Sequence, residues 1–173
     1  DEFNDAGLRQ IHMDQKKEFR REFSKYVEKE YRTWIAGDGP VMSHNIIDHH
    51  VKPLLKNGDK VYLLVIDCLR HDHWLAIEQK LEQLFVIERD LYYSLLPTAT
   101  PFSRNALFAG MLPKDIAKIH PDIFENAGHD GYSMNRYEHE LLDMNLARSG
   151  IRLNRPTVYE KVLTTEDAQG CFK

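Results

Sequence analysis

The feature that most constrains the fold is a run of six consecutive apolar residues, VYLLVI, at residues 61–66. The run is rich in β-branched side chains and lies between the turn-like sequence NGDK and Asp67. A short apolar run with such boundaries is typical of a strand that is buried on both faces, as in a parallel sheet. It therefore predicts the central strand of an α/β domain.

A helix and a second strand are predicted after this run. The apolar residues that follow recur at helical spacing: Trp74, Ile77, Leu81, Leu84 and Phe85. RDLYYSLLP, at residues 89–97, is then typical of a second strand. A strand, a helix and a strand of this length form a βαβ unit, in which both strands are parallel. We therefore expect Asp67 and the PTATP loop to leave the same edge of the sheet, where ligands bind in open α/β sheets.

The chain before residue 59 is predicted to be helical. Apolar residues in 8–35 recur mostly at threes and fours between charged ones, which predicts one long amphipathic helix. The aromatic stripe of this helix would pack either against the rest of the protein or against a partner. Packing against its own protein is the usual role of such a stripe. A second helix is expected from Pro40, with Pro53 kinking it or ending it at His50. We expect a helical preamble at 1–58 and the α/β domain at 59–173.

Length, charge and cysteine content narrow the class of protein. A chain of 173 residues suits one domain with a core. Its net charge is -4 and its basic residues are scattered, which argues against a protein that binds duplex DNA. Cys68 and Cys171 have no metal-binding spacing and favour a reducing compartment, so we expect a cytoplasmic protein. Cys68 is expected to be buried, and no apolar run approaches the ~20 residues of a membrane-spanning helix.

The stretch LLPTATPFSRNALFAG, at residues 95–110, places a threonine at the start of a predicted helix. Thr caps helices and Pro favours their first turn, so capping is one explanation for Thr100. The other is chemical, because Asp67 is expected at the same edge. A threonine hydroxyl can act as a nucleophile when a base or a metal activates it.

The two motifs together resemble the alkaline phosphatase superfamily, and most closely its PglZ-domain branch. In that superfamily an aspartate ends the first strand, often as Asp-x-x-Arg, which Asp67 and Arg70 match. The nucleophile stands ten residues before a glycine, as Thr100 does before Gly110. Phosphodiesterase relatives have Pro-Thr-x-Thr with the second threonine as the nucleophile, as at residues 97–100. The resemblance implies the first part of a doubly wound parallel sheet flanked by helices.

The resemblance also implies roles for particular residues. Thr100 would be the catalytic nucleophile and would contact a metal, and Asp67 would ligate a metal, in a site with two zinc ions. Ser103 or Arg104 would bind the phosphoryl group. Arg104 falls where sulfatase relatives have an arginine four residues after the nucleophile. The helix N-terminus would offer backbone N–H groups to the phosphoryl oxygens.

The remaining metal ligands of the superfamily come from later strand ends, often as Asp-His-Gly, which this chain lacks. GHDGY, at residues 128–132, is typical of a solvated turn. The pairs His49–His50 and His71–His73 are spaced so that neither shares one helix face. The chain also begins without methionine. We therefore expect a piece of a longer protein that holds the first part of a phosphatase-like domain and is inactive alone.

From Leu8 onward the chain is also similar to response regulators of bacterial type IX secretion, in which a receiver domain precedes helices and a PglZ domain. This similarity implies a sensor histidine kinase and secretion-related regulators as partners, with small nucleotides or oligonucleotides as substrates. A homodimer and a non-catalytic signalling module, which uses the fold as a binding and dimerisation surface, stay open as alternatives. Phosphoglycerate mutase-like transfer is less favoured, because serine normally stands at the nucleophile position there.

Overall fold

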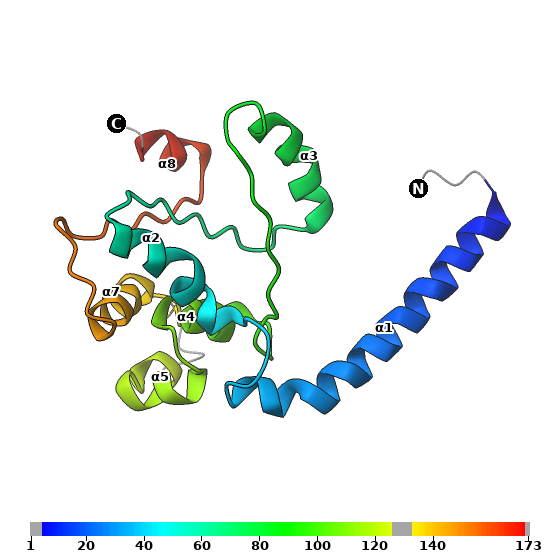
Figure 1. Ribbon diagram of the computed structural model, residues 1–173, viewed down its shortest axis with the longest axis horizontal. Coiled ribbons are helices and arrows are strands. Elements are labelled where there is room, and N and C mark those ends of the chain that lie inside the picture. The colour runs from blue at the N-terminus through cyan, green and yellow to red at the C-terminus, as the bar shows by residue number, and fades with distance from the viewer. Residues whose placement is uncertain (1–4, 126–132, 172–173) are drawn as a thin grey trace. The chain divides into compact units, whose positions relative to one another are not determined.

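The computed structural model describes residues 5–125 and 133–171. The chain divides into two compact units, Asp1–Pro40 and Val41–Lys173, and each is described by itself (Figure 1). All of the predicted site residues belong to the second unit.

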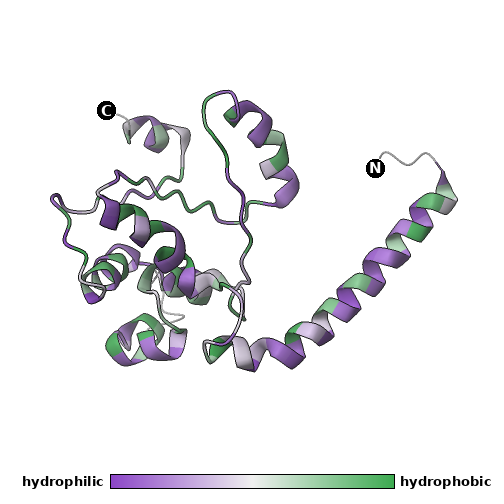
Figure 2. Ribbon diagram, viewed as in Figure 1, coloured by the Kyte–Doolittle hydropathy of each residue, from purple (hydrophilic) through white to green (hydrophobic). Residues whose placement is uncertain are grey.

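The first unit is one long helix, α1 (Ala6–Ile35), which confirms the predicted amphipathic helix. Asp5 caps its start, because the carboxylate accepts from the backbone N–H of Gly7 at 2.7 Å. Hydrophobic and hydrophilic residues alternate along its whole length (Figure 2). Among the described residues no helix, α1 included, combines the length and apolarity needed to cross a membrane.

The second unit consists of short helices joined by irregular segments. Their bounds are η1 (Ser43–Asn45), η2 (Ile47–Val51), α2 (Lys52–Asn57), α3 (His71–Leu81), α4 (Thr100–Ala109), α5 (Pro113–Ile119), α6 (Asp122–Glu125), α7 (Glu138–Arg148) and α8 (Thr165–Gly170). α4 is the central element, since it packs against α7, η1 and α5. The helices predicted after residues 61–66 and from Thr100 are confirmed as α3 and α4, although α3 ends at Leu81, before Leu84 and Phe85.

The predicted doubly wound parallel sheet is wrong for the part of the chain that the structure describes, which contains no strand and no sheet (Figure 1). Residues 61–66 have no regular secondary structure and are largely exposed. A single parallel bridge joins Met42 to Tyr93, so the second predicted strand pairs at one residue with the chain before the run. An apolar run forms a strand only where a neighbouring segment supplies backbone hydrogen bonds, and periodicity does not show whether one is near.

Pro53 determines how the helix before residue 58 is built. It lies in the first turn of α2 and has no N–H to donate. Just before it, the N–H of Lys52 bonds to the carbonyl of Ile47, five residues back, which makes η2 a π-helical turn. The helix therefore does not end at His50, since it continues through Pro53 to Asn57 with a π-helical turn before the proline.

The core of the second unit lies between α4 and α7. Asn145 on α7 is fully buried, donates to the carbonyl of Phe108 at 3.0 Å and accepts from Lys52 Nζ at 2.7 Å. Gly110 ends α4 with φ 60°, and a Cβ there would come within 2.6 Å of Asn145 Nδ2. These contacts fix the C-terminal end of α4 and so help to place its N-terminal end, where Thr100 lies.

Candidate functional site

The start of α4 lies beside Asp67. Thr100 Oγ1 donates to Asp67 Oδ2 at 3.2 Å, although 33 residues separate the two in the chain. Ala99, and not Thr100, is the N-cap residue, and its side chain makes no capping bond. Capping therefore does not explain Thr100, which is the first residue of the helix and turns its hydroxyl to a carboxylate.

Three groups hold the Asp67 carboxylate. Besides Thr100, the backbone N–H of Cys68 donates to Oδ1 at 3.0 Å, and Arg104 Nη1 lies 3.4 Å from Oδ2. Burial alone would raise the pKa of Asp67, but the two hydrogen bonds and the Arg104 charge together lower it. Asp67 is thus a carboxylate held in its ionised form next to a hydroxyl.

Cys68 lies in a strained turn directly after Asp67. Its φ of 57° is uncommon for a residue other than glycine, and its side chain is exposed. The prediction that Cys68 is buried is therefore wrong, because the run before it is not a buried strand. The turn directs the Cys68 N–H toward the Asp67 side chain.

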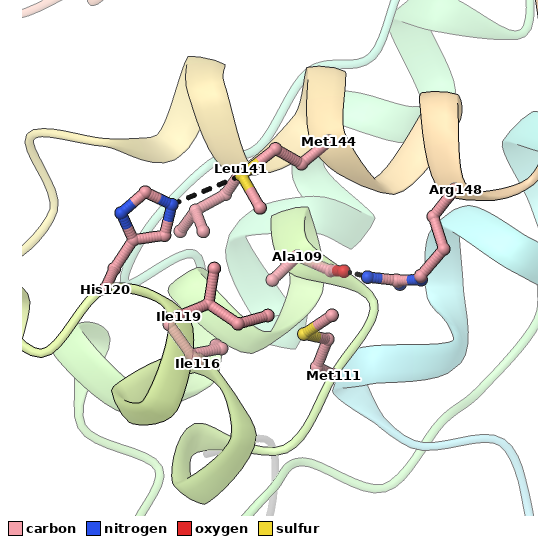
Figure 3. A pocket seen from close by; sticks show the side chains of 8 residues that line it. All are labelled: Ala109, Met111, Ile116, Ile119, His120, Leu141, Met144 and Arg148. Carbon is pink, nitrogen blue, oxygen red and sulfur yellow. Dashed lines mark hydrogen bonds between the residues drawn. The ribbon is translucent and has the colours of Figure 1, made fainter.

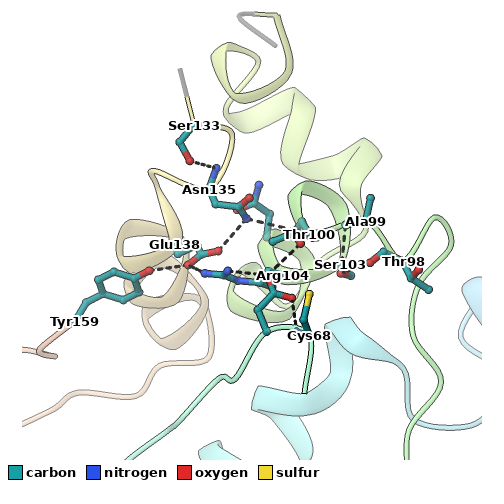
Figure 4. A network of polar contacts seen from close by, with 12 residues as sticks. Cys68, Thr98, Ala99, Thr100, Ser103, Arg104, Ser133, Asn135, Glu138 and Tyr159 are labelled. Carbon is teal, nitrogen blue, oxygen red and sulfur yellow. Dashed lines mark hydrogen bonds and ion pairs between the residues drawn. The ribbon is translucent and has the colours of Figure 1, made fainter. Parts of the chain in front are cut away.

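Arg104 lies between two carboxylates, one on each side of the guanidinium. Nη2 bonds to Glu138 Oε2 at 2.5 Å, and Nη1 faces Asp67 (Figure 4). Burial would lower the pKa of Arg104, but the two carboxylates raise it. Nε is buried and has no acceptor among the described residues. A buried donor without an acceptor costs free energy, so this guanidinium retains capacity for one more oxygen.

Ser103 does not join this cluster through its hydroxyl. Oγ donates back to the loop, to the carbonyl of Thr98 at 3.2 Å or of Ala99 at 3.3 Å (Figure 4). The start of α4 also offers fewer free backbone N–H groups than the resemblance implies. Pro101 has none, and the N–H groups of Phe102 and Ser103 both bond to Ala99 O. Within the described residues this leaves the Thr100 N–H free to bind an anion.

Three residues of the site were missed by the sequence analysis: Asn135, Glu138 and Tyr159. Glu138 is only 1% exposed and accepts from Tyr159 Oη at 2.6 Å and from Asn135 Nδ2 at 2.8 Å. Burial, followed by the bond to Glu138, raises the pKa of Tyr159 to about 12. A signal was present, since Glu138 shares helical spacing with the buried residues Leu141 and Asn145.

The zinc pair implied by the resemblance is not formed by the described residues. Asp67 and Thr100 bring two oxygen donors together, but no group of three or more His, Cys, Asp or Glu side chains occurs within 5–125 and 133–171. A catalytic zinc usually has three protein ligands and an open position, so these two residues by themselves do not complete a zinc site. The GHDGY turn, with His129 and Asp130, lies outside the described residues.

A small cavity under α4 and α7 is not a competing site. Its volume of about 10 Å³ is enough for roughly one water molecule. It is mostly apolar, and inside it His120 Nε2 lies 3.2 Å from Met144 Sδ (Figure 3). The lining residues are Ala109, Met111, Ile116, Ile119, His120, Leu141, Met144 and Arg148. The candidate site is the surface around Asp67, Thr100 and Arg104, where the clustered polar side chains lie.

Comparison with known proteins places the chain in a family. No curated protein matches it. Residues 46–170, which are more than half of the chain, match the family described as the BREX system PglZ alkaline phosphatase-like domain. The matched range includes Asp67, Thr100, Arg104 and Glu138. The chain therefore belongs to the PglZ family of alkaline phosphatase-like domains.

Proposed function

We propose that the surface around Asp67 and the start of α4 is part of a phosphatase or phosphodiesterase site in which Thr100 is the nucleophile. The observation that carries this proposal is the 3.2 Å hydrogen bond from Thr100 Oγ1 to Asp67 Oδ2. A nucleophile and the group that accepts its proton must lie within such a distance. Membership of an alkaline phosphatase-like family supports phosphorus as the atom attacked.

In the proposed reaction Thr100 Oγ1 forms a bond to phosphorus while the bond from phosphorus to the leaving oxygen breaks. The hydroxyl proton passes to Asp67 and then to the leaving oxygen, which departs as an alcohol. Water then attacks the phosphorus of the threonyl phosphate while the bond from phosphorus to Thr100 Oγ1 breaks. A proton from the water passes to Oγ1, which regenerates Thr100 and releases the phosphate product. Arg104 would offset the negative charge on the phosphoryl oxygens, and the place of its guanidinium beside the Asp67 carboxylate that holds Thr100 supports this role.

Asp67 by itself is a weak base, because its pKa is lowered. The hydrogen bond therefore orients the Thr100 hydroxyl more than it ionises it. We propose zinc as the additional activator, with Asp67 and Thr100 supplying two of its oxygen ligands. Since the described residues do not supply a complete ligand set, no step of the reaction is assigned to the metal.

The wider biological role is proposed from sequence similarity alone. The chain would belong to the output part of a cytoplasmic response regulator like PorX, which acts in type IX secretion under a sensor histidine kinase. Small nucleotides or oligonucleotides would be its substrates. The second candidate function is a homodimer that signals without catalysis. In that case Thr100 would not be needed for the secretion phenotype.

The test is Thr100→Ala in the complete regulator, with this chain assayed beside it. We expect hydrolysis of a chromogenic phosphodiester to fall by about 10²-fold or more, because the nucleophile is lost. Thr98→Ala is the matched control, since Thr98 is exposed and only its carbonyl contacts the site. Full hydrolysis by Thr100→Ala would contradict the proposal, and an intact secretion phenotype would favour the signalling role. Zinc content of the parent and of Asp67→Asn tests the metal separately.

A further inference from the structure

We propose that Glu138 is a positioning residue that holds the Arg104 guanidinium where it can bind a phosphoryl oxygen beside Thr100. The inference rests on the proposed function and deepens it, because it names the group that keeps the phosphate-binding arginine in place. Glu138 would touch neither substrate nor the reacting atoms. It would act only through Arg104 and, by way of Asn135, through the backbone of Thr100.

The two carboxylates around Arg104 hold it unequally. Glu138 Oε2 lies 2.5 Å from Nη2, whereas Asp67 Oδ2 lies 3.4 Å from Nη1. The Glu138 side chain is 1% exposed and that of Asp67 is 45% exposed. Buried charge pairs are screened much less by solvent than exposed ones. Glu138 therefore determines where the guanidinium lies, and Asp67 is left largely to Thr100.

Glu138 is itself held from two sides. Tyr159, on the segment after α7, donates to Oε2 at 2.6 Å, and Asn135 Nδ2 donates to Oε1 at 2.8 Å (Figure 4). The same Asn135 nitrogen lies 3.3 Å from the Thr100 carbonyl and 3.4 Å from Asn105 Oδ1, so its two shorter contacts are those with Glu138 and Thr100. An amide nitrogen has two hydrogens and can serve both acceptors. One carboxylate is thereby linked to the arginine side chain and to the first residue of α4.

Loss of Glu138 would have two opposite effects on phosphate binding. Removing a negative charge next to Arg104 would by itself strengthen the binding of an anion. Releasing the guanidinium would weaken it, because the nearest remaining carboxylate is Asp67, and a close Arg104–Asp67 pair would occupy the phosphate-binding group. A positioning role requires the second effect to prevail, so the sign of the change in affinity is diagnostic.

The experiment measures binding of inorganic phosphate to this chain by ³¹P NMR titration. We expect Glu138→Gln to weaken binding about tenfold, the order of one hydrogen bond to a charged group. Glu140→Gln is the matched control, because Glu140 lies on the same helix, is exposed and loses the same charge. It should leave the affinity unchanged. Glu138→Asp keeps the charge on a shorter side chain and should also weaken phosphate binding. This variant replaces Glu138→Gln in the experiment if Glu138→Gln does not fold.

A second readout separates positioning from a purely structural role. The Arg104 Nε–H signal should be protected from solvent exchange in the parent and in Glu140→Gln, and should lose that protection in the Glu138 variants. Unchanged or tighter phosphate binding in a folded Glu138 variant would overturn the inference, as would a parent chain that does not bind phosphate. Weaker binding in these variants, together with full hydrolysis by Thr100→Ala, would support the inference while the proposed nucleophile failed.

Discussion

Residues 61–66 and residues 106–109 are both uninterrupted apolar runs, but they have opposite fates in the structure. The second run lies in α4 and is buried, with Phe108 only 4% exposed. In the first run the side chains from Tyr62 to Ile66 are exposed, and Leu64 reaches 76%. The difference shows that an apolar run indicates a need for burial and does not by itself show that burial occurs.

The reason lies in the backbone of each run. A helix satisfies its own N–H and C=O groups, so α4 needs only side-chain partners, and α7, η1 and α5 supply them. An extended run needs a neighbouring strand for its backbone as well. Within the described residues the only β-type pairing is the bridge from Met42 to Tyr93, which does not include residues 61–66.

The largest expected effect comes from removing an aromatic ring in the buried run. Phe108→Ala should lower the free energy of unfolding by about 3–5 kcal/mol, because it leaves a cavity between α4 and its neighbours. Phe85→Ala is the matched control: Phe85 is 62% exposed, and its loss should cost about 0.5 kcal/mol or less. Urea unfolding of both variants measures the difference. Equal losses would mean that the two rings are equally buried in solution.

A methyl group at the end of α4 should have the next largest effect. Gly110→Ala places a Cβ at a left-handed φ and within 2.6 Å of the buried Asn145 amide, so we expect a loss of about 2–3 kcal/mol. Gly150→Ala meets a similar φ of 68° but has no atom within 4 Å of the new Cβ, and should cost about 1 kcal/mol. Thermal unfolding of both variants measures the difference in stability, which is the contribution of the contact with Asn145. A Gly110→Ala protein as stable as Gly150→Ala would show that Asn145 is free to move.

The pKa of the Tyr159 phenol should show whether its surroundings next to Phe108 and Glu138 are buried in solution. Its pKa is raised to about 12, so it stays protonated well above the ordinary value of about 10. Because the folded pKa is the higher one, its contribution to stability is present below pH ~10 and is lost as the pH rises toward 12. Phenolate absorbance, taken as the difference from Tyr159→Phe, measures this pKa. Glu138→Gln should lower it, and an unchanged pKa would contradict the hydrogen bond between the two side chains.

The smallest effect is expected in the exposed run. Leu64→Lys should change the free energy of unfolding of this chain by no more than about 0.5 kcal/mol, because the side chain already lies in solvent. Urea unfolding beside the parent measures it. A loss above about 1.5 kcal/mol would show that residues 61–66 are covered in solution, and the contrast with α4 would then disappear.

The sequence predicts that Asp67 and Thr100 lie together, but by way of a sheet that the described residues do not form. The structure reaches the same juxtaposition through the packing of α4 and a strained turn at Cys68. Their proposed chemical roles stay predictions. Glu138 was missed because an acidic residue at the start of a helix is normally solvated. Its helical spacing with Leu141 and Asn145 is a weak signal, and its contacts with Arg104 and Tyr159 establish its place in the site.

Local sequence patterns were enough to predict the helices α1, α3 and α4, because helix periodicity and glycine stops act within a few residues of one another, although α3 ends at Leu81 and not at Phe85. Motifs in the sequence also indicate the PglZ family, which the match of residues 46–170 confirms. Which apolar run is buried, and which charged side chains surround Arg104, follow only from the three-dimensional packing. Those outcomes depend on segments far apart in the chain, and a local pattern carries no information about which distant backbone or carboxylate will be near.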